Sequence, residues 1–442
     1  MKKIFFIAIA VSVFAIEGCS AMQIDETKFV SVNGTHFTLN GKPYYFAGTN
    51  LWYGCYLGSP GATGDRERLK RELDKLNELG LNNLRVMASS EDSYIKKTLK
   101  PVIQPAPGEY NEELLQGLDF LLAEMGKRGM HAVIFLNNYW EWSGGFASYN
   151  KWFGDGNVVD PYDTLQSWGK FMDFSAEFYR NEKANEQFRK FIYKILTRRN
   201  TITDLNYTDD PAIMSWQLAN EPRPGWNESS AKFVDYYYKW IDETAAYIHS
   251  IDPNHLVSTG SEGVIGSLQN EEIFFKAHQS KNIDYVTFHL WIKNWGWFDS
   301  SRPDETYPQA EKNAVDYIKQ NIEIAAKLGK PVTMEEFGLG RDLDSCKAGA
   351  QSKVRDKYFK KIFNEIYESA ASGSPVAGLN VWAWGGEGRG KNADNIWRQG
   401  DPFMGDPPHE PQGLYSVFDN DYSTLDIIRK YAEQMNNISP TK

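Results

Sequence analysis

Eight short runs of apolar and β-branched residues recur along the chain, and a segment with helical periodicity follows each one. In those segments apolar residues fall at positions i, i+3, i+4 and i+7, which is the pattern of an amphipathic helix. Because parallel strands need long crossover connections, this alternation predicts a parallel sheet whose connections are helices. The expected strands are residues 44–49, 82–87, 132–137, 213–219, 256–259, 285–288, 332–336 and 378–382. The expected helices are residues 67–79, 111–127, 184–197, 230–250, 270–278, 310–328, 353–370 and 422–435.

Eight strand–helix units are what a closed (β/α)8 barrel requires, and the chain lacks an obvious nucleotide fingerprint of the kind found in open doubly wound sheets. We therefore predict an α/β fold, a TIM barrel, as a single domain over residues 28–437. Ahead of the barrel, residues 30–34 and 37–41 predict a short β-hairpin with Asn33 and Gly34 as its turn.

The N-terminus has the three-part layout of a secretory signal peptide. Two lysines follow Met1, residues 4–16 are apolar, and small residues occupy positions 18–21. The apolar run is too short for a bilayer-spanning helix, so we predict a signal peptide over residues 1–21 and export of the mature chain. Cys19 lies in a loose bacterial lipoprotein cleavage box, so both lipid attachment there and plain cleavage after Ala21 are considered. The expected location is secreted, periplasmic or lipid-anchored at the cell surface.

Charge and cysteine content exclude several classes of protein. The net charge is −10 and no basic block interrupts the chain, which argues against nucleic acid as a partner. After processing only Cys55 and Cys346 would remain, too few for a disulfide framework or a cysteine metal cage, and their pairing stays open. The 7 histidines occur singly, without the spacing of a catalytic zinc site. We expect a monomer that needs no metal and no cofactor.

Two carboxylates stand where two of the predicted strands end. The fourth strand runs into Glu221, and the seventh ends at Glu336. Because all strands of a closed barrel open at one mouth, the two side chains are predicted to converge there. Taken singly, each is typical of a helix cap or of an ion pair with an arginine at the rim. In matched positions, among many tryptophans, the pair indicates an active site.

The segments around these glutamates resemble those of a known enzyme family. Two segments, 216–222 (WQLANEP) and 335–338 (EEFG), resemble the signatures of glycoside hydrolase family 5. Three more, 48–54, 288–291 and 382–389, are similar to its β-mannanase branch. The resemblance extends over essentially the whole mature chain. It implies retaining endo-hydrolysis of β-1,4-mannosidic linkages in mannan, glucomannan or galactomannan. It also implies Glu221 as the acid/base and Glu336 as the nucleophile.

Glu335 competes with Glu336 for the role of nucleophile. Side chains alternate along a strand, so if one of the two faces the mouth, the other points away. The family's nucleophile directly precedes an aromatic residue and a glycine, which selects Glu336. Retention needs the nucleophile ionised and the acid protonated, and a cation beside Glu336 would separate the two pKa values.

The resemblance further implies sugar-binding residues around the pair. Arg85 matches the cation beside the nucleophile, with an ordinary ion pair inside the barrel as the alternative. Asn220 matches the residue that binds the 2-hydroxyl of the reacting sugar, and Trp382 matches the sugar platform. His289 matches an active-site histidine, and Trp291 stands where many relatives carry tyrosine.

Other residues at the predicted strand ends are candidates for substrate contacts. Asn137 and Asn138 end the third strand and are expected to bind hydroxyls, with packing or a turn as the alternative. Tryptophans at or just beyond strand ends predict a cleft that stacks on the apolar faces of sugars. They are Trp52, Trp140, Trp142, Trp291, Trp295, Trp297, Trp382 and Trp384. For Trp295 and Trp384 a packing role is considered equally.

The expected partner is β-mannan polysaccharide or its oligosaccharides. The nearest enzymatic alternative is a β-1,4-glucanase on the same barrel, since mannose and glucose differ by the orientation of one hydroxyl. An exo-acting β-mannosidase is another, if the loops at residues 140–154 or 295–306 block one end of the cleft. A catalytically silent glycan-binding surface lipoprotein is the non-enzymatic alternative, and the presence of both Glu221 and Glu336 argues against it.

Overall fold

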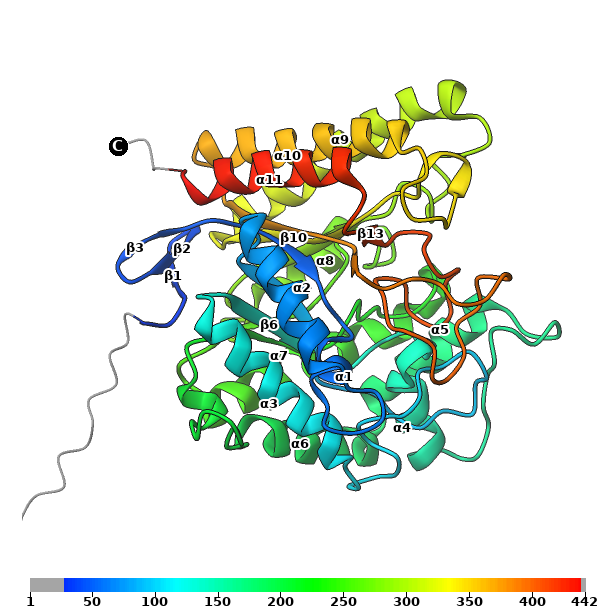
Figure 1. Cartoon of the computed structure of the whole chain (residues 1–442). Helices are drawn as coiled ribbons and strands as arrows, with labels where there is room; N and C mark the ends of the chain where they lie inside the picture. Colours follow the sequence, from blue (N-terminus) through cyan, green and yellow to red (C-terminus); the bar gives the residue numbers. More distant parts are fainter. Residues whose placement is uncertain (1–27, 439–442) are drawn as a thin grey trace, which may run out of the picture.

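The computed structural model describes residues 28–438, and its centre is a sheet of eight parallel strands (Figure 1). These are β4 (Phe46–Asn50), β5 (Asn83–Met87), β6 (His131–Phe135), β7 (Ile213–Gln217), β8 (Leu256–Ser258), β9 (Val286–Leu290), β10 (Val332–Phe337) and β11 (Val376–Val381). They lie in the order β8-β7-β6-β5-β4-β11-β10-β9, and a bridge between Ser258 and Tyr285 joins the two ends into a barrel. Each observed strand overlaps one predicted strand, so the predicted (β/α)8 barrel is confirmed.

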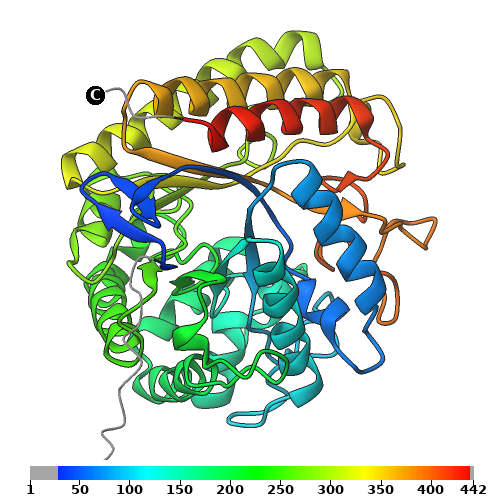
Figure 2. The same ribbon diagram turned by 60° about the vertical axis from the view of Figure 1, so that its left-hand side comes forward.

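Helices surround the barrel, and all those expected from periodicity are present. They are α2 (Arg66–Glu78), α3 (Glu112–Lys127), α6 (Glu182–Leu196), α7 (Val234–Ile251), α8 (Glu271–Gln279), α9 (Pro303–Leu328), α10 (Lys353–Ala371) and α11 (Tyr422–Asn436). Side chains that accept backbone N–H bonds cap the first turns of four of them: Asp65 for α2, Asn111 for α3, Asn181 for α6 and Asn270 for α8. Helices α9, α10 and α11 lie side by side along one flank (Figure 2).

The segment ahead of the barrel forms a small antiparallel sheet, β1 (Ser31–Asn33), β2 (His36–Leu39) and β3 (Lys42–Tyr44). The predicted hairpin corresponds to β1 and β2, whereas β3 was not predicted. Tyr44 therefore belongs to this sheet, and the first barrel strand begins at Phe46 instead of residue 44. Phe37 is fully buried and packs edge-on against Tyr285, with ring centroids 5.3 Å apart. The small sheet thus contributes to the core at the end of the barrel where the strands begin.

Several short elements in the loops after the strands were not expected. They are α1 (Gly54–Gly58), α4 (Gly145–Phe153), α5 (Trp168–Ala176), and the parallel pair β12 (Trp384–Gly386) and β13 (Val417–Phe418). Short 3-10 turns occur at Glu141–Ser143, Glu177–Arg180, Tyr207–Asp209, Glu228–Phe233 and Asp342–Asp344. Helices this short depend on tertiary packing more than on propensity. Phe146 of α4, for example, stacks on Phe178 with centroids 4.2 Å apart.

The predicted signal peptide, including Cys19, lies outside the described residues and stays a prediction. Across residues 28–438, none of the helices combines the length and apolar character needed to cross a bilayer.

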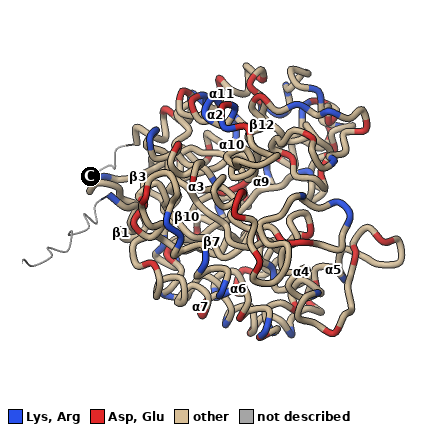
Figure 3. Tube along the Cα trace, turned by 60° about the horizontal axis from the view of Figure 1, so that its bottom comes forward, with Lys and Arg blue, Asp and Glu red and all other residues tan. Residues whose placement is uncertain are grey.

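Cys55 and Cys346 are both free thiols, so the pairing left open by the sequence is not present. Acidic and basic residues are interspersed along the outer helices and loops (Figure 3).

Candidate active site

Glu221 and Glu336 line one cleft of about 670 Å³ at the end of the barrel where the strands stop. Glu221 lies four residues beyond β7, and Glu336 is the fifth residue of β10. One carboxylate oxygen of each, together with one ring nitrogen of His289, lie within 4.8 Å of one another. The structure therefore brings together the two carboxylates that the sequence places in different strand–helix units. Glu221 has a φ of 49°, a left-handed conformation that costs energy for a residue other than glycine.

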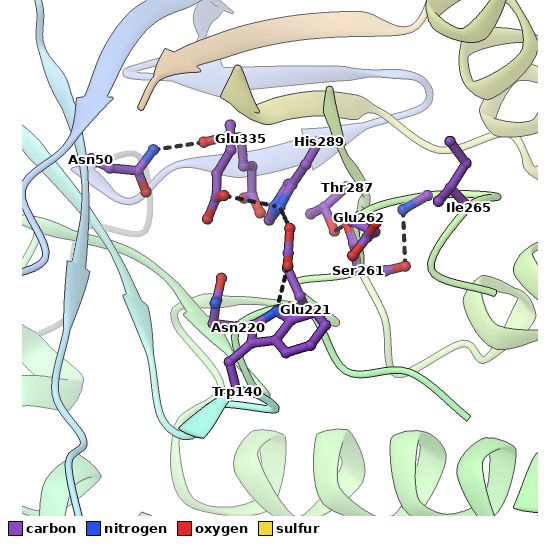
Figure 4. Close-up of polar contacts among 12 residues, drawn as sticks. Asn50, Trp140, Asn220, Glu221, Ser261, Glu262, Ile265, Thr287, His289 and Glu335 are labelled. Carbon is purple, nitrogen blue, oxygen red and sulfur yellow. Dashed lines mark hydrogen bonds and ion pairs between the residues drawn. The ribbon is translucent and has the colours of Figure 1, made fainter. Parts of the chain in front are cut away.

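His289 stands between the two carboxylates, and Figure 4 shows its contact with Glu221. Its Nδ1 lies 2.6 Å from Glu221 Oε1 and 3.3 Å from Glu336 Oε2. Burial, with the positive charge of Arg85, lowers the pKa of His289 well below its usual value, so the ring is neutral at physiological pH. A neutral imidazole with hydrogen on Nδ1 donates to Glu221. Trp140 Nε1 donates to the other oxygen of Glu221 over 2.6 Å, which fixes the orientation of this carboxylate.

Arg85, in β5, is fully buried and orients the second carboxylate. Its Nη1 donates to Glu336 Oε1 and, over 3.1 Å, to Asn50 Oδ1. Its Nη2 donates to Asn220 Oδ1 over 2.7 Å, and its Nε to Gln217 Oε1 over 2.8 Å. The guanidinium thus links Glu336 to Asn220, the residue next to Glu221. A bidentate, permanently charged group is suited to holding such a set in one geometry.

Glu335 lies deeper in the barrel than Glu336, and its position corrects the simple alternation argument. Its Oε2 accepts from Gln217 Nε2 over 2.6 Å and lies 3.8 Å from Arg85 Nε. It does not line the cleft, yet it does not point out of the barrel either. The pairing of β10 with β9 shifts register between Met334 and Glu336. Because this irregularity breaks strict alternation, both carboxylates of the pair reach Arg85.

The pKa of Glu336 also differs from expectation. Burial raises it well above its usual value, the nearby Glu221 raises it further, and the charge of Arg85 opposes the rise. The sequence predicted a cation beside Glu336 that would help to separate the two pKa values. Arg85 is that cation, but removal of the carboxyl group from water outweighs its effect on the pKa of Glu336. Two carboxyl groups this close titrate as a pair, with proton affinities that belong to both.

Asn137 and Asn138 do not line the cleft, contrary to the expected contacts with sugar hydroxyls. Asn138 Oδ1 accepts from Asn220 Nδ2 and from the backbone N–H of Trp140, each over 3.1 Å. Asn137 Oδ1 accepts from the backbone N–H of Asn138 over 2.9 Å. These contacts of Asn138 and of Asn137 Oδ1 hold the loop after β6, so the packing or turn alternative describes the two residues better. Asn138 positions two residues that do line the cleft.

Tryptophans form much of the cleft, although not all of those predicted. The predicted Trp140, Trp142, Trp291, Trp295 and Trp382 line it, and Trp168 and Trp226 join them. Trp52 is buried elsewhere and donates its Nε1 hydrogen to the Gly405 carbonyl over 2.7 Å. Trp384 likewise donates to Glu72 over 2.7 Å, and Trp297 packs on Trp295 away from the lining. The prediction that Trp52 binds substrate is therefore not supported by its position, because its polar edge is satisfied inside the fold.

Arg223 and Glu262 form an ion pair in the cleft that sequence reasoning missed. Arg223 Nε donates to Glu262 Oε2 over 2.9 Å, and its guanidinium lies 5.0 Å from the centroid of the Trp140 ring. Burial raises the pKa of Glu262 to about 7; the charge of Arg223 opposes this rise and that of Glu221 adds to it. A signal was present, since Glu262 follows the fifth predicted strand and Arg223 is two residues beyond Glu221.

The loop between β12 and β13 contributes two more residues that were not predicted, His409 and Glu410. The His409 ring stacks on Trp142 with centroids 6.3 Å apart and planes at 13°. Burial raises the pKa of Glu410 well above its usual value, and the nearby Asp406 adds to the rise. These residues are far from any predicted strand end, so only the folded loop brings them to the cleft.

Glu221, His289 and Glu336 offer three atoms that could together bind a metal ion. The charge of Arg85 lies against Glu336, and the nearest oxygen of Glu221 already accepts a hydrogen bond from His289. A divalent cation at this point would be repelled by the guanidinium. The donor set is better suited to a neutral sugar, whose hydroxyls and ring oxygen need donors and acceptors.

Comparisons with known proteins show which family the chain is similar to. The model of the family described as GH family 5 beta-mannosidase-like matches residues 27–440. A putative mannan endo-1,4-beta-mannosidase 4 of Arabidopsis thaliana is 30% identical over 461 aligned residues, covering 100% of this chain and 99% of the relative. Mannan endo-1,4-beta-mannosidase 4 of Solanum lycopersicum is 32% identical, covering 81% and 84%. The structure of a glycoside hydrolase family 5 mannosidase from Rhizomucor miehei superposes with a TM-score of 0.85 at 38% identity, covering 94% and 99%.

A closed barrel whose mouth holds two facing carboxylates in a tryptophan-lined cleft defines a glycoside hydrolase. The chain belongs to glycoside hydrolase family 5, within its β-mannosidase-like group.

Proposed function

We propose that this enzyme hydrolyses β-1,4-mannosidic linkages inside mannan, glucomannan or galactomannan, with retention of anomeric configuration. The observation that carries the mechanism is the approach of Glu221 and Glu336, whose nearest ligand atoms lie within 4.8 Å. Retaining enzymes hold their carboxyl groups about 5–5.5 Å apart, whereas inverting enzymes leave about 6.5–9.5 Å for a water molecule. The substrate proposal is supported by relatives that are named mannan endo-1,4-beta-mannosidases.

Glu336 is the proposed nucleophile and Glu221 the proposed acid/base. An oxygen of Glu336 bonds to the anomeric carbon while Glu221 gives its proton to the glycosidic oxygen, and the leaving chain departs with that proton. Water then attacks the same carbon, Glu221 takes a proton from it, and the bond to Glu336 breaks. Arg85 holds Glu336 Oε1 and leaves Oε2 beside His289, on the side toward Glu221.

The protonation of the pair follows from its neighbours. When the pair carries one proton, the negative charge is more stable on the carboxylate beside the guanidinium. Arg85 contacts Glu336, and its charge favours the ionised form of this carboxyl, which is the form that attacks the anomeric carbon. The Nδ1–H of the neutral His289 lies within reach of both Glu221 and Glu336. It can therefore donate a hydrogen bond to Glu221 each time this residue has given up its proton during the reaction.

Asn220 and Trp382 complete the proposed site for the reacting sugar. Arg85 fixes Asn220 Oδ1, and the Asn220 side chain lines the cleft, where it is placed to bind the 2-hydroxyl. Trp382 lines the cleft with Trp291 edge-on against it, at a centroid distance of 6.0 Å. Trp291 has no phenolic hydroxyl for Glu336, and His289 occupies that neighbourhood.

Two measurements test the proposal: the anomeric configuration of the first product, and the activity on two different polysaccharides. Proton NMR of a mannohexaose digest should show the β-anomer first at each newly formed reducing end, before it equilibrates with the α-anomer. Initial formation of the α-anomer would contradict retention. Activity should be much higher on mannan than on carboxymethylcellulose, and the opposite preference would favour a β-1,4-glucanase.

An exo-acting β-mannosidase is the second candidate, and one contact favours it. His409, from the loop between β12 and β13, stacks on Trp142 from the loop after β6, so the two loops meet at the cleft wall. The Rhizomucor miehei structures at 38% identity are named mannosidase, and one contains mannosyl-fructose. Mannohexaose digests separate the modes, since an exo enzyme releases only mono- or disaccharide from the start. His409→Ala should then broaden the early products, whereas an endo enzyme gives mixed sizes in both forms.

Export through residues 1–21 and a monomeric state are also proposed. Labelling of expressing bacteria with radioactive palmitate would reveal lipid attachment, and Cys19→Ser should abolish it. If the label is absent from both forms, cleavage without lipid attachment is favoured. Size-exclusion chromatography with light scattering would test the monomer against the chain mass of 50.5 kDa.

A further inference from the structure

Two tryptophans at the rim of the cleft are unusually open to solvent. Trp226 is 49% exposed and Trp168 is 37% exposed, and both line the cleft. Burying an indole is favourable, because it removes a large apolar area from water. A ring left half exposed beside a binding cleft has an unfilled apolar face to offer to a ligand.

The backbone at Trp226 is held firmly by polar contacts. Its N–H donates to Asp173 Oδ1 over 3.1 Å and to Ser230 Oγ over 3.0 Å. Ser230 in turn donates to the same oxygen of Asp173. Gly225 has a φ of 124°, and a Cβ there would lie 2.3 Å from the Cβ of Ser230. The turn that presents the indole therefore depends on a glycine and on a serine–aspartate clamp.

The indole itself rests on the first turn of α5. A Cβ added to Gly169 would lie 3.1 Å from Cδ1 and Cγ of Trp226, so the ring packs directly against this glycine. Trp168, the preceding residue, contacts Trp140 edge-on with centroids 6.1 Å apart. One side of Trp226 is thus supported by protein while much of the ring stays accessible. Such pre-organisation lowers the entropy lost when a ligand stacks on the ring.

The position of this rim relative to the reacting bond follows from a chain of contacts. Trp140 bonds to Glu221, Trp168 contacts Trp140, and Trp226 packs on the residue next to Trp168. The contacts therefore run outward from the proposed acid/base. That residue protonates the leaving group, whereas Glu336 and Trp382 hold the sugar that is attacked. The exposed rim consequently lies on the side of the leaving chain.

We propose that Trp226 forms an outer subsite that stacks on the apolar face of a mannosyl unit in the leaving chain, with Trp168 beside it. This inference rests on the proposed function and adds a residue that determines preference for long substrates. The clamp of Asp173 and Ser230 positions the ring and makes no contact with sugar in this proposal.

The first test compares a long and a short substrate. In Trp226→Ala, the ratio of kcat/KM for mannohexaose to kcat/KM for an aryl β-mannoside should fall about tenfold, because only the longer substrate reaches the subsite. Trp226→Tyr should restore much of the ratio, since it keeps an aromatic face. Tyr193→Ala removes another exposed ring, 56% accessible and outside the cleft lining, and should leave the ratio unchanged.

The second test determines on which side of the reacting bond Trp226 acts. Mannohexaose labelled at its reducing end is digested, and the labelled fragments are sized. Loss of a subsite for the leaving chain shifts cleavage toward the reducing end, so Trp226→Ala should release shorter labelled fragments. Longer labelled fragments, or an unchanged ratio and pattern, would overturn the proposal. Absence of activity on both mannose substrates in the wild type would instead contradict the proposed function itself.

Discussion

Two buried arginine clusters in this molecule use the same chemistry in different places. In the first, Arg85 is bound by Glu336 and by three side-chain amides. In the second, Asp421 binds both Arg341 and Arg355, the latter over 3.2 Å. All three arginines are essentially inaccessible to solvent. Burial of a paired charge is therefore not in itself a mark of function, because both clusters show it.

The clusters differ in what surrounds their ion pairs. Arg341 also donates to the carbonyls of Gly413 and Ser416, each over 2.9 Å, and Asp421 stands at the start of α11. This cluster ties loops to a helix. Three partners of Arg85 lie on barrel strands and the fourth, Asn220, lies just beyond β7. Two of these partners, Asn220 and Glu336, line the cleft. A buried ion pair indicates catalysis where its acceptors also face a space for substrate.

The largest effect expected is on turnover when either cleft carboxylate is removed. Glu221→Ala and Glu336→Ala should each lower kcat on an aryl β-mannoside by about 10³-fold or more. Both variants should fold, because each keeps a negative partner for the buried Arg85. Glu335 remains 3.8 Å from Arg85 in both variants and compensates its charge. The measurement pairs steady-state kinetics with thermal unfolding. Activity like that of the wild type in either variant would refute the role assigned to that residue.

Arg85→Met should break the first cluster in both stability and activity. It leaves Glu335 and Glu336 buried without a countercharge, so the free energy of unfolding should fall by about 3–5 kcal/mol. Loss of the oriented nucleophile should lower kcat/KM by about 10²-fold. Arg85→Lys is the matched control, because it keeps the positive charge but loses the two-pronged guanidinium. Its stability and its kcat/KM should lie between those of Arg85→Met and the wild type. Denaturant titration and kinetics on the same samples check both effects. Full activity in Arg85→Met would show that this cluster is purely structural.

Asp421→Asn should break the second cluster in stability alone. Arg341 and Arg355 would lose their shared countercharge, and the free energy of unfolding should again fall by about 3–5 kcal/mol. Because this cluster lies outside the cleft, kcat/KM of the folded variant should stay within about twofold of the wild type. Denaturant titration and kinetics at low temperature check the two values. A loss of activity as large as in Arg85→Met would remove the distinction between the clusters.

Glu91 adds a third case to the comparison of the two arginine clusters, because it is a buried carboxyl group that forms no ion pair with an arginine among the described residues. Its Oε2 accepts from the backbone N–H of Gly145 over 2.9 Å, and burial raises its pKa from 4.5 to about 8. The native state thus binds this proton more tightly than the unfolded chain does. Its contribution to stability is present at acid pH and is lost as pH rises from about 4.5 to about 8.

Glu91→Gln removes this dependence and should therefore be more stable than the wild type at pH 8, by up to about 4 kcal/mol. At pH 5 the two should be similar. Urea unfolding at both pH values measures the difference, with the exposed Glu67→Gln as the control. A variant less stable than the wild type at pH 8 would show that Glu91 is charged and stabilising.

Apolar runs were enough to predict every barrel strand, and helical periodicity was enough to predict the long helices that cover the barrel. It failed at α1, α4 and α5, which are short, rich in glycine and aromatic residues, and stabilised by contacts such as Phe146 on Phe178. It also failed where β10 shifts register, since alternation assumes a regular strand. Local patterns report local geometry, and these features depend on neighbours that are distant in the sequence.

The tryptophans illustrate the same limit at the site. Trp140 and Trp52 both occur just beyond strand ends, yet one bonds to Glu221 and the other to the Gly405 carbonyl. Position in the sequence brings a residue near the mouth of the barrel. Whether its polar edge is free for substrate depends on which loop packs against it.

The amino-acid sequence by itself determined the eight strand–helix units and the placement of Glu221 and Glu336 at the ends of two strands. Periodic burial acts over short stretches of chain, so the strands and helices can be predicted from local sequence. The two glutamates can then be placed together because all strand ends of such a barrel share one mouth. The tertiary structure alone decided that His289 stands between the carboxylates, that Arg223 pairs with Glu262, and that His409 meets Trp142. Each of these depends on angstrom-scale packing of loops that no local pattern encodes.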